Sequence, residues 1–157
     1  DVYKRQVIGI GEASYHAANM LGGHFSVITT LKRSIPALKK NLKNYGLYDN
    51  CVSLSSVDIP VLELESNLNL TEQKIEEKIK EILDNSDTEI FVLGCAGMAD
   101  FAIKMKKKYN IPVIEGISVA VKFAESFIDL DLKTSSRNSF ATPRSKKFTG
   151  IFKNFEV

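Results

Sequence analysis

The sequence has few of the residues on which disulfide-bonded and metal-binding proteins depend. Its 157 residues include two cysteines, Cys51 and Cys95, and two histidines, His16 and His24. Two cysteines do not make a disulfide framework, and with no signal peptide visible we expect a reducing, cytoplasmic compartment. The histidines are too few and too poorly spaced to form a zinc site with the cysteines, so we expect no metal.

Long apolar runs and a strong charge of one sign are also absent. No apolar run approaches the length needed to span a bilayer, and the formal net charge is +2. We therefore expect neither a membrane nor a nucleic-acid partner. Apolar residues make up 44% of the chain and charged residues 25%, which is ordinary for a globular protein with one sizeable core.

Short strand patterns alternate with helical patterns along most of the chain. The expected strands are residues 7–10, 25–29, 51–57, 90–93 and 112–114. The expected helices are residues 12–21, 34–46, 71–83, 97–109 and 119–130. This alternation predicts an α/β fold with a parallel sheet and right-handed crossovers, of the Rossmann-like or flavodoxin-like type. In the flavodoxin-like order, the strands at 25–29 and 90–93 are neighbours at the switch point.

The most informative segment is residues 89–98, where an apolar strand ends at Gly94 and Cys95 follows at once, ahead of a helix. Open parallel sheets bind ligands at this carboxyl edge. The free N–H groups at the start of the helix, and its dipole, favour the thiolate over the thiol. A small buried hydrophobe is the alternative reading of this cysteine. Gly94 and Gly97 favour the functional reading, because glycine lets a ligand approach the backbone.

Three other features of the sequence bear on the predicted ligand site at Cys95. Thr29 and Thr30 end the neighbouring strand, so we expect them to face the same crevice as Cys95. Cys51 opens a strand about 20 Å from the opposite edge of the sheet, and we expect it to be structural. Residues 9–14 half-resemble a dinucleotide-binding fingerprint, but Ser14 stands where the third glycine belongs. A tight strand-to-helix turn is the better interpretation.

Residues 93–100, Leu-Gly-Cys-Ala-Gly-Met-Ala-Asp, resemble the motif around the second catalytic cysteine of hydantoin racemases, which belong to the aspartate/glutamate racemase superfamily. Allantoin racemases carry a similar motif. Further similar segments follow in family order, at residues 9–13, 25–31, 58–64, 112–116, 121–125 and 133–135. The resemblance covers nearly the whole chain from Val7 onward, and it does not separate hydantoin from allantoin as the substrate.

The resemblance implies two similar, pseudo-symmetric α/β lobes that each supply one cysteine to a cleft between them. Residues 1–6 are then a leader outside the fold, residues 7–22 a remnant of the first lobe, and residues 23–116 the complete second lobe. Residues 117–157 form a helix and tail that return to the first lobe. The first catalytic cysteine belongs just upstream of Val7, so we expect an N-terminally truncated enzyme whose full-length form is a homo-oligomer. The helices at 12–21 and 119–130 would expose apolar faces.

The reaction implied is cofactor-independent racemisation of a small cyclic ureide at the carbon next to a carbonyl. Cys95 is the expected acid/base group, and the fragment alone is expected to be inactive for want of a second one. The expected substrate-binding residues are Thr29, Thr30, Gly94, Ala96, Gly97, Glu115 and Gly116. Glu115 departs from the family, which more often has aspartate there. Two alternatives stay open, namely a single-cysteine decarboxylase of the arylmalonate type and a non-catalytic small-molecule-binding module.

Overall fold

The computed structural model describes residues 6–142, 144 and 147–154. Contacts divide the chain into two units, one formed by residues 8–125 and one formed by the two ends of the chain. In the second unit, the side-chain amide of Gln6 donates a hydrogen bond to the carbonyl oxygen of Leu132. The leader expected at residues 1–6 lies outside the described residues except for Gln6.

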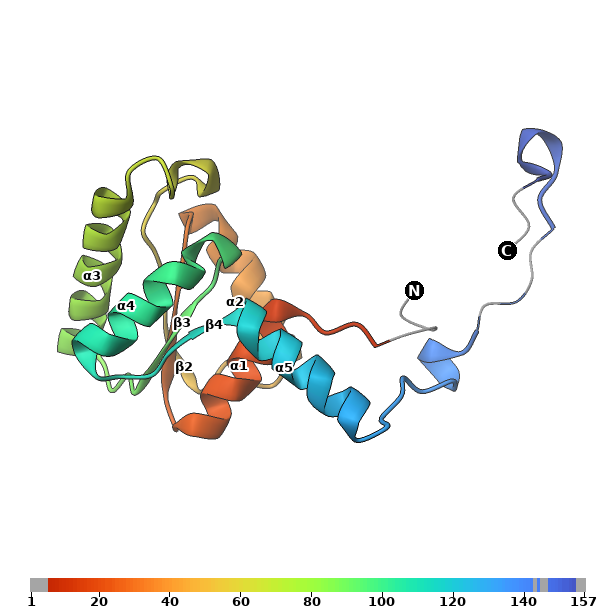
Figure 1. The fold of residues 1–157 in the computed structure, drawn as a ribbon, viewed down its shortest axis with the longest axis horizontal. Helices are drawn as coiled ribbons and strands as arrows, with labels where there is room; N and C mark the ends of the chain where they lie inside the picture. The colour runs from red at the N-terminus through yellow and green to blue at the C-terminus, as the bar shows by residue number, and fades with distance from the viewer. Residues whose placement is uncertain (1–5, 143, 145–146, 155–157) are drawn as a thin grey trace. The chain divides into compact units, whose positions relative to one another are not determined.

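Residues 8–125 contain a four-stranded parallel sheet with helices on both faces (Figure 1). The strands are β1 (Phe25–Thr29), β2 (Cys51–Ser56), β3 (Ile90–Leu93) and β4 (Val113–Glu115). Their order is β2-β1-β3-β4, and every neighbouring pair is parallel. This is the flavodoxin-like order, so the prediction that the strands at 25–29 and 90–93 are neighbours is confirmed.

The five expected helices are all present. They are α1 (Ile10–Leu21), α2 (Ile35–Asn44), α3 (Leu68–Asn85), α4 (Ala99–Tyr109) and α5 (Gly116–Asp129). Short 3₁₀ turns lie at Lys32–Ser34, Val61–Glu63, Ala96–Met98, Asn138–Phe140 and Gly150–Phe152. The strand expected at residues 7–10 was a wrong prediction. Ile10 instead opens α1, and residues 7–9 form no strand among the described residues.

Alternate residues of each strand face two separate hydrophobic clusters. Ile90 and Val92 of β3 pack with Tyr15 of α1 in one cluster, whereas Phe91 and Leu93 belong to the other. Helix residues of that second cluster are Ile75, Ile79, Ile82, Phe101 and Met105. Both faces of the sheet are thus covered, which explains why the central strand β3 is apolar at all four positions.

α1 packs on this sheet, although the resemblance assigns residues 7–22 to another lobe. Its residues Tyr15 and Ala18 are buried in the same cluster as β1 and β3. The expectation that this helix exposes its apolar face was therefore wrong at Tyr15 and Ala18, but other apolar side chains of α1 and α5 are exposed. Met20 of α1 is 77% exposed and Val121 of α5 is 50% exposed.

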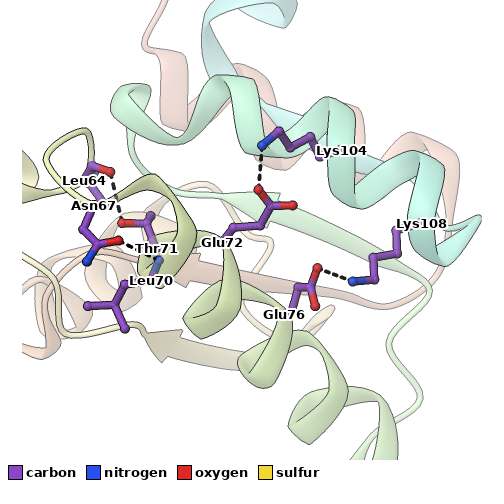
Figure 2. Close-up of polar contacts among 8 residues, drawn as sticks. All are labelled: Leu64, Asn67, Leu70, Thr71, Glu72, Glu76, Lys104 and Lys108. Atoms are coloured by element: carbon purple, nitrogen blue, oxygen red, sulfur yellow. Dashed lines mark hydrogen bonds and ion pairs between the residues drawn. The ribbon is translucent and has the colours of Figure 1, made fainter.

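α3 and α4 lie side by side and are joined by two ion pairs (Figure 2). Lys104 Nζ lies 2.6 Å from Glu72 Oε2, and Lys108 pairs with Glu76 one turn further along both helices. These pairs are partly exposed, so each contributes at most about 1 kcal/mol to stability. They link the two helices whose apolar side chains cover this face of the sheet.

The start of α3 fixes the irregular stretch that precedes it. The side chain of Asn67 caps the helix by accepting a hydrogen bond of 3.1 Å from the Leu70 N–H. The hydroxyl of Thr71 donates a hydrogen bond of 3.0 Å to the carbonyl oxygen of Leu64 (Figure 2). Leu64 is fully buried as a result, and it packs against the turn that carries Cys95.

Candidate active site

Cys95 lies at the carboxyl edge of the sheet, immediately beyond β3. The Gly94 N–H donates a hydrogen bond of 2.8 Å to the Ile28 carbonyl oxygen, which continues the pairing with β1. Cys95 itself has extended backbone angles, φ −140° and ψ 134°. Its carbonyl oxygen accepts a hydrogen bond of 3.0 Å from the Met98 N–H, within the 3₁₀ turn that leads into α4. The thiol therefore sits between a strand end and the start of a helical segment, as the sequence predicts.

The two cysteines occupy opposite ends of the sheet. Cys51 pairs with Phe25 at the start of β2 and β1. Its thiol donates a weak hydrogen bond of 3.4 Å to the Ser53 carbonyl oxygen, and burial raises the pKa of this thiol to about 12. Both cysteines are free. Cys51 is a protonated packing residue near neutral pH, at the edge where the sequence placed it.

A cavity of about 330 Å³ opens beside Cys95, within residues 8–125. Gly94, Cys95 and Ala96 line it from the turn after β3, and Gly116 lines it from the start of α5. The remaining wall comes from the start of α1, residues 9–12 with Ser14 and Tyr15, and from Leu38, Asn41 and Tyr45 of α2. A cavity of this size is at the lower end of the range for small-molecule sites.

Four of the eight predicted site residues line this cavity, namely Gly94, Cys95, Ala96 and Gly116. Thr29 and Thr30 end β1 beside Gly94 but are buried, and they do not line it. Their carbonyl oxygens accept backbone hydrogen bonds from the chain after β2. The crevice that the strand order predicts is present, but its second wall comes from helices instead of the threonines.

Glu115 and Gly97 occupy positions outside the cavity wall. The Glu115 carboxylate caps α5 by accepting hydrogen bonds of 2.8 Å from the Ile117 N–H and 2.9 Å from the Ser118 N–H. Gly97 lies against Leu64, where an added Cβ would be 3.0 Å from Leu64 Cδ1 and 3.9 Å from the Cys95 sulfur. Cys95 thus contacts the buried Leu64 cluster on one side and the cavity on the other.

Gly116 allows α5 to begin in contact with α1. A Cβ at this position would lie 2.5 Å from the carbonyl oxygen of Ile10 and 3.0 Å from its carbonyl carbon. Only a glycine permits this approach of two backbones, and the contact closes one side of the cavity.

The sequence prediction missed the wall formed by α1 and α2, above all Tyr15 and Tyr45. The Tyr15 ring stacks on Phe25, with 6.2 Å between ring centroids, and tilts against Tyr45 at 6.4 Å. The turn at residues 9–14 was a signal for this wall, because its glycines precede a helix at the ligand-binding edge. The turn is only a weak match to a nucleotide-binding motif. That it lines the cavity could be seen only once the structure had placed α1 on the sheet.

The described residues contain neither a cluster of metal-ligating side chains nor a membrane-spanning helix. Within them, no three His, Cys, Asp or Glu side chains gather in an arrangement that could hold a metal ion. No described helix combines the length and the apolar character needed to cross a membrane.

Comparisons with known proteins match this sequence and this fold. Residues 3–124 match the family model for Asp/Glu/Hydantoin racemase. The chain is 34% identical over 155 residues to a hydantoin racemase of Pseudomonas sp. (strain NS671), covering 99% of the chain and 62% of that protein. It is 37% identical over 150 residues to a hydantoin racemase of Rhizobium meliloti, covering 96% of the chain and 62% of that protein.

Solved structures of racemases also superpose on this chain. An allantoin racemase from Klebsiella pneumoniae superposes with a TM-score of 0.87 at 38% identity, over 94% of this chain and 60% of that one. A glutamate racemase isoform from Bacillus anthracis, at 18% identity and a TM-score of 0.56, shares the fold alone. The fold is therefore the α/β fold of the Asp/Glu racemases.

This chain belongs to the Asp/Glu/hydantoin racemase family, which confirms the resemblance seen in its sequence. It spans about three fifths of the length of the curated relatives it matches, 62% in both hydantoin racemases named above.

Proposed function

We propose that this chain carries one acid/base half of a racemase that acts on a cyclic ureide, either a 5-substituted hydantoin or allantoin, without a cofactor. Cys95 is the acid/base group in this proposal. The observation that carries it is the position of Cys95, which lines a cavity of about 330 Å³ between a strand end and a helical N-terminus. Similarity to hydantoin and allantoin racemases supports the choice of substrate class.

The chemistry requires one proton to leave a ring carbon next to a carbonyl. The Cys95 thiolate takes this proton. The electron pair of the broken C–H bond forms a C=C bond to the carbonyl carbon, and the π electrons of the carbonyl group move to its oxygen. An enolate results, and the thiol returns a proton to the carbon. The backbone N–H group of Ala96, which lines the cavity in the turn before α4, would stabilise the negative oxygen.

Inversion needs a second acid/base group on the opposite face of the substrate. Cys51 does not meet this need, because it lies at the other end of the sheet and its pKa is raised to about 12. In this proposal the second group lies outside these 157 residues, which span about three fifths of the length of the similar hydantoin racemases. We therefore propose that the 157-residue chain exchanges the substrate proton with solvent on one face and does not racemise the substrate.

A panel of three probes in D₂O tests this proposal against its alternatives. The probes are one enantiomer each of 5-benzylhydantoin and allantoin, and phenylmalonate. We expect deuterium at the ring carbon of a ureide with the wild-type chain, its loss in Cys95→Ser, and its retention in the matched control Cys51→Ser. A Cys95→Ser variant that exchanges as fast as wild type would refute the role of Cys95.

A single-cysteine decarboxylase is the second candidate, because Cys95 is the one cysteine that lines the cavity. In that reaction the bond to CO₂ breaks, its electron pair forms the enolate, and one thiol supplies the proton. Release of CO₂ from phenylmalonate, with no exchange into either ureide, would select it. Binding of a ureide with neither exchange nor CO₂ release would select a non-catalytic binding module.

A further inference from the structure

Tyr15 brings a hydroxyl to the cavity end of α1. Helical side chains lean toward the helix N-terminus, so its ring covers Gly11 one turn earlier. An added Cβ on Gly11 would lie 3.8 Å from the ring and 3.9 Å from the Tyr15 hydroxyl oxygen. Gly11 and Tyr15 both line the cavity that Cys95 lines. The hydroxyl therefore lies where α1 meets the cavity.

This hydroxyl has no hydrogen-bond partner among the residues that the structure describes, although Tyr15 is only 2% exposed. The adjacent Ser14 differs, because its hydroxyl donates a hydrogen bond of 2.8 Å to the Gly11 carbonyl oxygen. Although the ring is buried, the Tyr15 oxygen is not among the buried unpartnered side-chain atoms of the described residues, where the Tyr109 hydroxyl stands alone, so it is open to the cavity that Tyr15 lines. A hydroxyl that is open to a cavity and has no protein partner is available to hydrogen-bond a ligand.

Packing fixes the direction in which this hydroxyl can donate. The Tyr15 ring stacks on Phe25 and contacts Tyr45, which holds it in place before any ligand arrives. Burial, with smaller contributions from Cys51 and Tyr45, raises the pKa of Tyr15 to about 12. The phenol therefore keeps its proton near neutral pH and acts as a donor, not as a base.

The first turn of α1 also favours a negatively charged ligand oxygen at this end of the cavity. Gly9 at the N-cap has no side chain to satisfy the first N–H groups of this 12-residue helix, and residues 9–12 line the cavity. Free N–H groups and the positive end of the helix dipole favour a negatively charged oxygen.

We propose that the Tyr15 hydroxyl donates a hydrogen bond to the substrate carbonyl oxygen that becomes negative when Cys95 removes the proton. The Tyr15 proton stays on its own oxygen throughout, and only the ring-carbon proton moves, to the Cys95 sulfur. Tyr15 thus stabilises the enolate from the α1 side of the cavity. This inference rests on the proposed function and assigns a further residue to it.

The substitution Tyr15→Phe tests the inference, because it removes the oxygen and keeps the ring that packs on Phe25. The matched control is Tyr48→Phe, which removes a hydroxyl from the same hydrophobic cluster but away from the cavity wall. Both variants are compared with wild type for the dissociation constant of 5-benzylhydantoin, by calorimetry, and for deuterium exchange at saturating probe. Loss of one donor to a developing oxyanion lowers a rate by about a hundredfold.

We expect Tyr15→Phe to lower the exchange rate by about ten- to a hundredfold, with a smaller change in the dissociation constant, and Tyr48→Phe to change neither. A merely structural role would weaken binding and exchange together. Exchange at the wild-type rate in Tyr15→Phe, alongside its loss in Cys95→Ser, overturns the inference and leaves the proposed function intact. Undiminished exchange in Cys95→Ser overturns both.

Discussion

Replacing Gly116 with alanine tests the close contact between the first turns of α1 and α5. The new Cβ would lie 2.5 Å from the Ile10 carbonyl oxygen, 3.0 Å from its carbonyl carbon and 3.1 Å from Ile10 Cβ. The first two atoms belong to the backbone and cannot rotate away as a side chain would. One helix must therefore move away from the other, and the cavity wall must move with it.

The cost of Gly116→Ala follows from this contact. Overpacking a close-packed contact costs about 1–3 kcal/mol, and we expect the upper half of that range because backbone must shift. Alanine is the better helix former by at most about 1 kcal/mol, which offsets part of this loss. The net expectation is a decrease of about 1–2 kcal/mol in the free energy of unfolding.

Urea unfolding followed by circular dichroism measures this change, with Gly9→Ala as the matched control. An added Cβ on Gly9 meets nothing closer than 3.7 Å, and the φ of −73° suits alanine. We expect that control to stay within about 0.5 kcal/mol of wild type. A Gly116→Ala variant as stable as wild type would show that α1 and α5 are not in contact here.

Three further outcomes follow from exposure and burial in the structure. Iodoacetamide at about pH 8 should alkylate Cys95 much faster than Cys51, because the pKa of about 12 keeps Cys51 protonated; equal rates by mass spectrometry would contradict this. Tyr109→Phe should keep or raise stability by up to about 1 kcal/mol, because the buried Tyr109 hydroxyl has no partner among the described residues; a loss above 1 kcal/mol in urea unfolding would show that it has one. Val121→Lys should raise the monomer fraction in light scattering, because Val121 and Ile117 expose apolar surface on α5, and a wild-type chain already monomeric would refute that reason.

The strand that leads to Cys95 could be predicted from sequence because its signals are local. Ile90–Leu93 is an unbroken apolar run that ends at a glycine, and the structure has β3 at those residues. The alternation of elements predicted a parallel sheet but left the Rossmann-like and flavodoxin-like strand orders open, and the structure has the flavodoxin-like order, in which β1 and β3 are neighbours. A strand at residues 7–10 was wrongly expected because strand formation depends on a partner that the local pattern does not reveal.

The candidate site was predicted only where its residues are adjacent in sequence. Gly94, Cys95 and Ala96 share one turn and line the cavity together. Tyr15 joins them through the packing of α1 on the sheet, and an aromatic residue within a helix gives no local sign of facing a ligand. Glu115 was predicted to bind the substrate, but it does not line the cavity. Its carboxylate caps α5 instead, which is a common role for a carboxylate that precedes a helix.

The most direct test of the account measures deuterium at the ring carbon and the configuration of the substrate in the same sample. A single enantiomer of 5-benzylhydantoin is incubated in D₂O with the 157-residue chain, and chiral chromatography with mass spectrometry follows each enantiomer. The account predicts deuterium in the starting enantiomer, formation of the other enantiomer no faster than without protein, and loss of the label in Cys95→Ser. Labelling at the background rate with wild type, or labelling that persists in Cys95→Ser, would contradict the claim that Cys95 moves the proton.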